Sequence, residues 1–288
     1  MAGASSYLDR YRENGFAVVA GVFDAHAIGE LRQAFDEIKA VGEQHPATFR
    51  HGNLLYVVSR DAHLGSVLRF AQWPSYIHPV LARYRVDARM LALVEPLVGR
   101  TLKQTTNSMI WKTPDSADSS FAYHQDCRFR RPATAYRDLA TSLVQTAIAV
   151  DAHRPENGCM RMYPGSHRRG ELPFGARESI YEAACDDADL LRVGLDPAAL
   201  VDVCLDPGDV VIWNAYTVHG SHRNCSDGDR RLYINGYVVA SDCDRGEWAF
   251  RDGVACTLGA PALIQYEDLY VRPEPHYVDG PPHPVKLE

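Results

Sequence analysis

Several features are scarce in this sequence of 288 residues. No segment gathers Lys and Arg, and 30 basic against 37 acidic residues give a net charge of −7, which argues against nucleic acid as a partner. The longest apolar run near the start, residues 16–23, is far shorter than the roughly 20 residues that span a bilayer, so we expect no membrane association. The first 14 residues lack a signal-peptide pattern, and we expect a cytoplasmic protein.

The sequence also contains no C-x-x-C pair, although it has seven cysteines. An odd number of unpaired-looking cysteines indicates neither a disulfide framework nor a thiolate zinc site, so we expect free thiols. Hydrophobic residues make up 46% and charged residues 23% of the chain, as in ordinary globular proteins. The chain can therefore build a large core.

Hydrophobic residues recur at a helical spacing in two parts of the first third, over 24–42 and 87–98. A short β-branched run over 16–19 predicts a strand before the first of these helices. After Gly99 the period changes to two, which predicts strands, and turn residues separate nearly all of them. The predicted strands cover residues 101–112, 121–126, 141–151, 159–163, 201–205, 209–213 and 230–240.

The strands do not alternate regularly with helices, which favours an antiparallel sandwich or barrel over a doubly wound parallel sheet. We therefore expect a mainly β fold with flanking N-terminal helices, in one domain. A charged insertion over 168–200 has the length of a lid or binding loop. The expected domain covers 1–288, with a helical N-terminal layer over about 1–100, a β core over about 101–240 and a C-terminal extension over about 241–288.

Two residues on one predicted strand are candidates for metal binding. His124 and Asp126 are two positions apart, so on a strand their side chains point to the same side, about 7 Å apart along the backbone. A lone H-x-D pair is common by chance. His219, which follows a later predicted strand, would complete a set of two histidines and one carboxylate. That set holds non-haem Fe(II) and leaves positions open for further ligands.

Arg230 begins the last predicted strand of the core. Its guanidinium could bind a carboxylate through two hydrogen bonds. Arg231 is the alternative, but side chains alternate along a strand, so only one of the two can face the metal. His222 is likewise an alternative to His219 as the third ligand.

These residues stand within motifs that follow one another in chain order. The motifs are Asn14-Gly15-Phe16 leading to Gly21-Val22-Phe23, then His124-Gln125-Asp126, Pro155-Glu156-Asn157-Gly158-Cys159, Pro164-Gly165-Ser166-His167, Pro207-Gly208-Asp209, and His219-Gly220-Ser221 followed by Arg230. Together, from about residue 7 to 240, they resemble the phytanoyl-CoA dioxygenase-like (PhyH) family of Fe(II)/2-oxoglutarate-dependent oxygenases. Each motif is common singly, and their joint occurrence is specific.

The resemblance implies a double-stranded β-helix, also called a jelly-roll or cupin-like fold, with Fe(II) bound near the mouth of the barrel. It implies His124, Asp126 and His219 as metal ligands and catalytic residues. Arg230, helped by Ser221, would anchor the distal carboxylate of 2-oxoglutarate, and O2 would be the second co-substrate. The separation between His219 and Arg230 keeps the family spacing, which His222 would lose.

Asp126 distinguishes two reactions within this family. Relatives that chlorinate have a small residue in place of this carboxylate, whereas the carboxylate is present here. Hydroxylation is therefore favoured over halogenation.

Candidates for the remaining pocket are less specific. Ser108 is a further candidate for co-substrate binding. Arg128 stands in a loop with an aromatic residue and two more arginines. This loop either recognises an anionic substrate or is simply a charged loop exposed to solvent. Gln145 is a candidate because its neighbourhood lines the cavity in the family. Thr106 lies on the first strand of the core and is a candidate for substrate contact.

We expect an enzyme that hydroxylates, or otherwise oxidises, an unactivated C–H bond of a small molecule, with release of succinate and CO2. Secondary metabolites and amino-acid derivatives are favoured as substrates, and a homodimer is left open as the oligomeric state. One alternative is a non-redox cupin-type metalloenzyme, which would not need Arg230. Another is a ligand-binding protein with a degenerate iron site.

Overall fold

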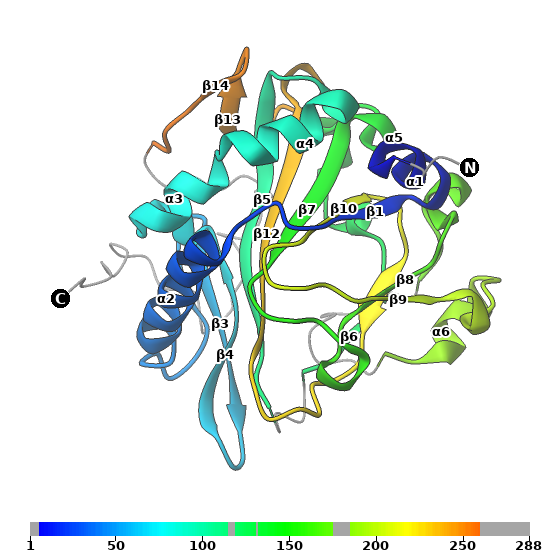
Figure 1. Ribbon diagram of the computed structural model, residues 1–288. Coiled ribbons are helices and arrows are strands. Elements are labelled where there is room, and N and C mark those ends of the chain that lie inside the picture. Colours follow the sequence, from blue (N-terminus) through cyan, green and yellow to red (C-terminus); the bar gives the residue numbers. More distant parts are fainter. Residues whose placement is uncertain (1–5, 115–118, 131, 175–184, 260–288) are drawn as a thin grey trace.

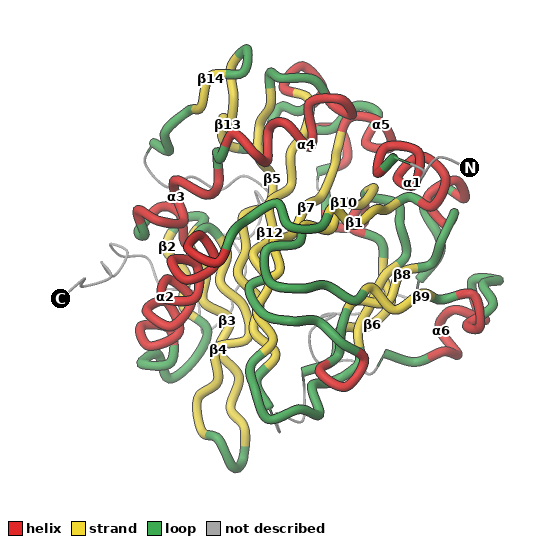
Figure 2. The backbone as a smooth tube through the Cα atoms, viewed as in Figure 1, coloured by secondary structure: helices red, strands yellow, loops and turns green. Residues whose placement is uncertain are grey.

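Two antiparallel sheets face each other, and the helices lie on the outside (Figures 1 and 2). The computed structural model describes residues 6–114, 119–130, 132–174 and 185–259. Buried side chains from both sheets form one apolar cluster between them, which includes Ala147 of one sheet and Met160 of the other. This arrangement is the expected jelly roll, so the mainly β fold with flanking helices is confirmed.

The larger sheet has ten strands. Eight of them follow the order β1-β10-β7-β12-β5-β4-β3-β2, while β13 pairs with β5 and with β14. Their bounds are β1 Phe16–Val19, β2 Phe49–His51, β3 Leu54–Asp61, β4 Gly65–Gln72, β5 Leu102–Lys112, β7 Leu143–Ala149, β10 Val210–Asn214, β12 Arg230–Val239, β13 Glu247–Arg251 and β14 Val254–Ala255.

The smaller sheet has four strands in the order β6-β11-β8-β9. Their bounds are β6 Phe121–His124, β8 Met160–Met162, β9 Val201–Val203 and β11 His219–Ser221. In this sheet His219 pairs with His124 on one side and with Met162 on the other. The pairing brings two segments that are far apart in the sequence into one place, between the sheets.

The helices lie outside the two sheets, most of them along the larger one (Figure 1). They are α1 Tyr7–Asn14, α2 Ala25–Gly42, α3 Pro79–Arg85, α4 Ala88–Val98, the short α5 Leu139–Ser142, and α6 Asp187–Arg192 near the smaller sheet. The side chain of Asp24 caps α2 by accepting a hydrogen bond from the Ala27 N–H. Both predicted helices, over 24–42 and 87–98, are confirmed.

Three strands were not expected. β2, β3 and β4 lie within the segment predicted as a helical layer, so that part of the prediction is wrong. The middle of β3, from Val57 to Ser59, is only half-buried on both faces, so the strand shows little of the alternation that marks a half-buried strand. The predicted strand over 141–151 is also shorter, because Leu139–Ser142 forms a turn of helix before β7.

Other expectations from composition can be compared with the structure. All seven cysteines are free thiols, as expected. Within residues 6–259, apart from the undescribed gaps, no helix combines the length and apolar character needed to cross a bilayer. The segment 260–288, most of the expected C-terminal extension, lies outside the described residues.

One turn allows a clear test of stability. Gly208 has a φ of +94°, and a Cβ at this position would lie 2.1 Å from the Phe23 carbonyl oxygen. We expect Gly208→Ala to lower the free energy of unfolding by about 2–4 kcal/mol, since it adds both backbone strain and overlap. Gly228→Ala is the matched control, because a Cβ there meets nothing within 4 Å. Equal denaturation midpoints for the two variants would contradict the expectation.

Candidate active site

Three side chains that are predicted to bind metal meet between the two sheets. Ligand atoms of His124, Asp126 and His219 all lie within 4.8 Å of one another, and all three residues are buried. The Nε2 atom of His124 is 3.9 Å from Asp126 Oδ1, and that of His219 is 3.8 Å from Asp126 Oδ2. The two imidazole rings are 4.2 Å apart between centroids. The geometry is that of a site for one ion.

Asp126 reaches this position in a way that differs from the prediction. β6 ends at His124, and Asp126 begins a 3₁₀ turn that extends to Phe129. The two residues are therefore not neighbours on one face of a strand. The turn folds the carboxylate back toward the imidazole of His124.

The main chain fixes the orientation of both imidazoles. His124 Nδ1 lies 2.7 Å from the Ala122 carbonyl oxygen, and His219 Nδ1 lies 2.9 Å from that of Thr217. A carbonyl only accepts, so each Nδ1 carries the proton and each Nε2 keeps a lone pair for a metal. Burial, followed by repulsion from His219, lowers the pKa of His124 to about 3. The ring is therefore neutral near pH 7, as a metal ligand must be.

The larger sheet supplies the partners of the carboxylate. The Trp213 indole N–H donates to Asp126 Oδ2 over 2.8 Å, and Gln145 Nε2 donates to the same oxygen over 3.1 Å. Burial would raise the pKa of Asp126, but the neighbouring imidazoles, Arg130 and the Trp213 hydrogen bond hold it below its ordinary value. The carboxylate is therefore ionised. Trp213 and Gln145 both donate to Oδ2, so neither of them occupies Oδ1.

These donors fit a divalent transition metal. Two neutral imidazole nitrogens with free lone pairs and one carboxylate oxygen converge on one point from within the sandwich. This set of nitrogen and oxygen ligands suits non-haem Fe(II). The second hydrogen bonds that hold each ligand are those expected around a metal centre.

Gln125 stands between two of these residues but does not join them. Its Nε2 donates to the carbonyl oxygens of Gly170 and Tyr216, and its Oε1 accepts from the Leu172 N–H. Gln125 thus connects the start of the 168–200 insertion to the segment that contains His124 and Asp126. Part of that insertion, 175–184, lies outside the described residues.

A second group of charges lies at the other end of the same interior. Arg230 on β12 pairs directly with Lys112 on β5, and both side chains are buried. Within the described part of the chain neither forms an ion pair, and Arg230 Nε has no hydrogen-bond partner. Arg230 Nη1 lies 3.3 Å from His153 Nδ1, and Lys112 Nζ donates to the His222 carbonyl.

This pairing of like charges is costly in the absence of an anion. Burial lowers the pKa of Arg230 to about 10, and burial followed by repulsion from Arg230 lowers that of Lys112. Ser108, on the same strand as Lys112, has a buried hydroxyl without a partner among the described residues. Ser221 is buried two positions after His219. The arrangement is suited to a carboxylate.

Of the predicted substrate residues, Gln145 contacts a metal-binding residue directly, through its hydrogen bond to Asp126. Arg128 is half-buried, with its guanidinium 5.5 Å from the centre of the Phe129 ring. Arg130, from the same loop, is buried and donates to the Thr106 hydroxyl over 2.7 Å. β12 lies between β5 and β7, and its Gly236 pairs with Thr106 on one side and with Gln145 on the other.

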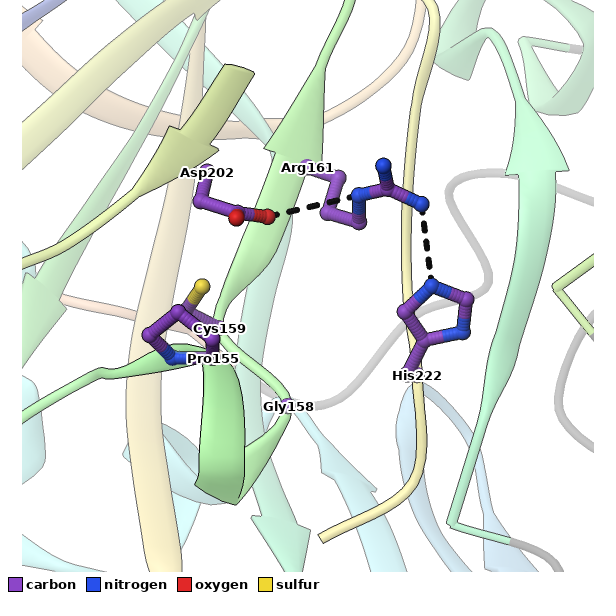
Figure 3. Close-up of a pocket in the computed structure, with 6 residues that line it drawn as sticks. All are labelled: Pro155, Gly158, Cys159, Arg161, Asp202 and His222. Carbon is purple, nitrogen blue, oxygen red and sulfur yellow. Dashed lines mark hydrogen bonds and ion pairs between the residues drawn. The ribbon is translucent and has the colours of Figure 1, made fainter. Parts of the chain in front are cut away.

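The alternatives left open by the sequence point away from this centre. Arg231 faces the other side of β12 and pairs with Asp151 over 2.8 Å. His222 lines a separate pocket of about 260 Å³, where its Nε2 lies 2.9 Å from Arg161 Nη1 (Figure 3). Asp202 contacts the same guanidinium from the other side. None of the three metal-binding candidates lines this pocket.

Two residues of the site were missed from the sequence, and the role of a third, Arg130, was not separated from that of its neighbours. Trp213 stands in a strand whose residues are all buried, so no alternation marks its direction. Lys112 is significant only because of its pairing with Arg230, which the sequence does not reveal. Arg130 was noted as one of three arginines in a loop. Its burial could not be distinguished from that of its neighbours.

Comparisons with known proteins agree with this geometry. The family model described as phytanoyl-CoA dioxygenase (PhyH) matches residues 11–232. Dioxygenase lolE1 of Epichloe uncinata is 31% identical over 162 residues, a match that spans 56% of this chain and only 54% of that protein. Methylphosphonate hydroxylase of Gimesia maris is 25% identical and is covered over 85% of its length, against 86% of this chain.

A solved structure shares the fold. The epimerase SnoN, in complex with Fe3+, alpha ketoglutarate and nogalamycin RO, superposes with a TM-score of 0.55 at 24% identity, covering 91% of this chain and 95% of SnoN. The family model covers most of the sequence and includes His124, Asp126, His219 and Arg230. The chain therefore belongs to the phytanoyl-CoA dioxygenase (PhyH) family of Fe(II)- and 2-oxoglutarate-dependent oxygenases.

Proposed function

We propose that the protein hydroxylates, or otherwise oxidises, an unactivated C–H bond of a small molecule in a reaction that consumes 2-oxoglutarate. The observation that carries the proposal is the placement of two complementary sites in one interior. A metal-binding set lies at His124, Asp126 and His219, and a buried pair of cations lies at Arg230 and Lys112.

We assign the metal to the three side chains His124, Asp126 and His219. Fe(II) bound there, with 2-oxoglutarate and O2 as co-substrates, would supply the oxidising chemistry and release succinate and CO2. The protein holds the ligands in place through Trp213, Gln145 and main-chain carbonyls. It also excludes water, since each ligand is less than a tenth exposed.

We assign the distal carboxylate of 2-oxoglutarate to Arg230. Its unpartnered Nε and the ammonium group of Lys112 across the strand pair would both gain a counter-charge on binding. The hydroxyls of Ser221 and Ser108 are assigned to the same co-substrate. Among the described residues, Arg230 Nε and the Ser108 hydroxyl have no hydrogen-bond partner, and this supports the assignment because buried polar atoms without partners are uncommon in proteins.

We assign the substrate to the side lined by Thr106, Gln145 and the loop with Arg128. Arginines near this side favour a molecule with an acidic group. One relative is named a methylphosphonate hydroxylase, and the structural neighbour SnoN is in complex with nogalamycin RO, so proteins similar to this chain bind varied small molecules. A role in natural product biosynthesis or amino-acid modification fits this range. A cytoplasmic location, a single domain and a homodimer stay predictions.

The test is release of succinate from 2-oxoglutarate by the Fe(II)-loaded protein in a screen of small organic molecules. We expect succinate release to depend on air and to be stimulated by particular compounds. Binding of Fe(II) and 2-oxoglutarate is measured separately without oxygen. Absence of both binding and turnover would overturn the proposal. Ligand binding with no oxygen consumption would favour the degenerate binding protein.

A further inference from the structure

His153 is a fully buried histidine that does not belong to the metal-binding set. Its main chain exchanges two hydrogen bonds with that of Leu205, over 2.8 and 3.2 Å, so its backbone position does not depend on the imidazole. The ring lies against β12, where one nitrogen is beside the Arg230 guanidinium and the other is beside the Arg231 carbonyl. The imidazole thus contacts the arginine that we assign to the co-substrate.

The two neighbours of the imidazole determine where its proton lies. Nε2 is 3.2 Å from the Arg231 carbonyl oxygen, which only accepts, so Nε2 carries the proton. Nδ1 is 3.3 Å from Arg230 Nη1, and a guanidinium only donates, so Nδ1 presents its lone pair. Burial, followed by repulsion from Arg230, lowers the pKa of His153 well below its ordinary value. The ring is therefore a neutral acceptor for Arg230.

A neutral acceptor has a particular advantage at a site for an anion. An acidic side chain at position 153 would pair with Arg230 and compete with an incoming carboxylate. The neutral imidazole instead fixes the direction of Nη1 and leaves the positive charge uncompensated. The guanidinium is therefore oriented before the anion binds, which lowers the entropic cost of binding. Arg230 Nε has no hydrogen-bond partner among the described residues.

The carboxylate of Asp151 acts on Arg230 but is held by other cations. Burial lowers the pKa of Arg230, and the charge of Asp151 opposes this effect in part. Asp151 Oδ2 accepts from Arg231 Nε over 2.8 Å, and its Oδ1 accepts from Arg231 Nη2 over 3.0 Å. Arg32 Nε also lies 3.5 Å from Asp151 Oδ1. His153 is thus the side chain that orients Arg230 without pairing its charge.

We propose that His153 is a positioning residue for 2-oxoglutarate, which orients the Arg230 guanidinium through a neutral hydrogen bond and leaves its charge available to the distal carboxylate. The inference rests on the proposed function and adds a residue to the co-substrate site. His153 acts on the co-substrate through Arg230. A substitution at position 153 should therefore alter 2-oxoglutarate binding and leave metal binding unchanged.

His153→Asn and His153→Asp test the charge of the acceptor, because the two side chains have the same shape. Binding of 2-oxoglutarate to the Ni(II)-loaded protein is measured by calorimetry, which does not require turnover. We expect His153→Asn, which keeps a neutral oxygen close to the position of Nδ1, to have a Kd within about threefold of the wild type. We expect His153→Asp to bind at least about 30-fold more weakly than His153→Asn, because its carboxylate pairs with Arg230.

The stability of the ligand-free protein should change in the opposite direction. His153→Asp supplies a counter-charge to a buried cation, so its melting temperature should equal or exceed that of His153→Asn. Ni(II) affinity should be the same in both variants, since neither residue is a metal ligand. A protein that is more stable and yet binds 2-oxoglutarate more weakly is not expected if His153 only supports the fold.

His153→Leu tests whether the effect passes through Arg230. This variant removes the acceptor, while the Arg231 carbonyl keeps a hydrogen bond from the Val150 N–H. We expect it to weaken 2-oxoglutarate binding by about tenfold in the wild-type background. In the Arg230→Met background the same substitution should change the Kd by less than about twofold, because no guanidinium remains to be oriented.

His78→Leu is the matched control. His78 is also a buried histidine, but its Nε2 lies 2.9 Å from Glu37 Oε2 on helix α2. We expect this variant to lose stability and to keep the wild-type Kd for 2-oxoglutarate. A loss of 2-oxoglutarate affinity in His78→Leu equal to that in His153→Leu would reflect general destabilisation and would refute the positioning role.

The remaining outcomes separate this inference from the proposed function. If the wild-type protein binds metal and 2-oxoglutarate but His153→Asp binds 2-oxoglutarate as tightly as His153→Asn, the positioning role is refuted and the oxygenase proposal stands. An equal effect of His153→Leu with and without Arg230 also refutes it. If the wild-type protein binds neither Fe(II) nor 2-oxoglutarate, the proposed function fails, and this inference fails with it.

Discussion

His219→Ala is expected to abolish 2-oxoglutarate turnover and to weaken Fe(II) binding by more than about 100-fold. Loss of residues that merely support metal ligands typically costs 10- to 100-fold in affinity, so loss of a ligand should cost more. The imidazole is buried beside Asp126 and His124 and makes no contact that the strand pairing of β11 requires. Metal affinity is measured by titration without oxygen, and folding is checked by circular dichroism.

His222→Ala is the matched control for this experiment. The residue is also a histidine, lies three positions later, and contacts Arg161 at the separate outer pocket (Figure 3). Its carbonyl, which accepts the hydrogen bond from Lys112, remains in the variant. We expect metal affinity and turnover near those of the wild type. A larger loss in His222→Ala than in His219→Ala would show that the ligand assignment is wrong.

Arg230→Met is expected to raise the KM for 2-oxoglutarate by about 30-fold to several thousand-fold. Removing one partner of a buried, hydrogen-bonded charge pair costs about 2–5 kcal/mol, and each 1.4 kcal/mol is a factor of ten. Metal binding should persist, since Arg230 is not among the residues of the metal-binding set. The measurement is KM for 2-oxoglutarate, together with direct binding of 2-oxoglutarate without oxygen.

The same variant separates a binding role from a structural one. Arg230 is a buried cation opposite Lys112, and among the described residues it has no ion pair. Replacing it by Met should therefore leave the free energy of unfolding of the ligand-free protein unchanged or higher. Arg231→Met is the control, because Arg231 pairs with Asp151 on the outer face and should affect stability but not KM. Unchanged KM in Arg230→Met would favour the non-redox cupin-type alternative.

Much of the site could be predicted because its residues belong to short motifs with fixed spacing. His124, Asp126 and His219 converge as expected, and Arg230 faces the interior while Arg231 faces out. Strand alternation predicted that only one of the two arginines faces the interior, and the choice of Arg230 came from its family spacing after His219. The rest of the fold required longer-range information. The strands β2 to β4 show weak alternation, and their place beside β5 is set by pairing across the sheet.

The partners of the motif residues could not be predicted either, because they also depend on contacts between distant parts of the chain. Trp213 and Gln145 reach Asp126 from a different sheet, so their contact depends on how the two sheets pack. The pairing of Lys112 with Arg230 depends on the register between β5 and β12. Sequence motifs identify groups that carry chemistry, whereas register and packing determine what surrounds them.

The hydrogen bonds from both imidazoles to main-chain carbonyls have a consequence for how this protein can diverge. Every amino acid at positions 122 and 217 supplies a carbonyl oxygen, so no point substitution deletes the acceptors that orient His124 and His219. These two acceptors are therefore kept when side chains are replaced, so residues that contact the substrate can vary while both imidazoles keep their main-chain partners.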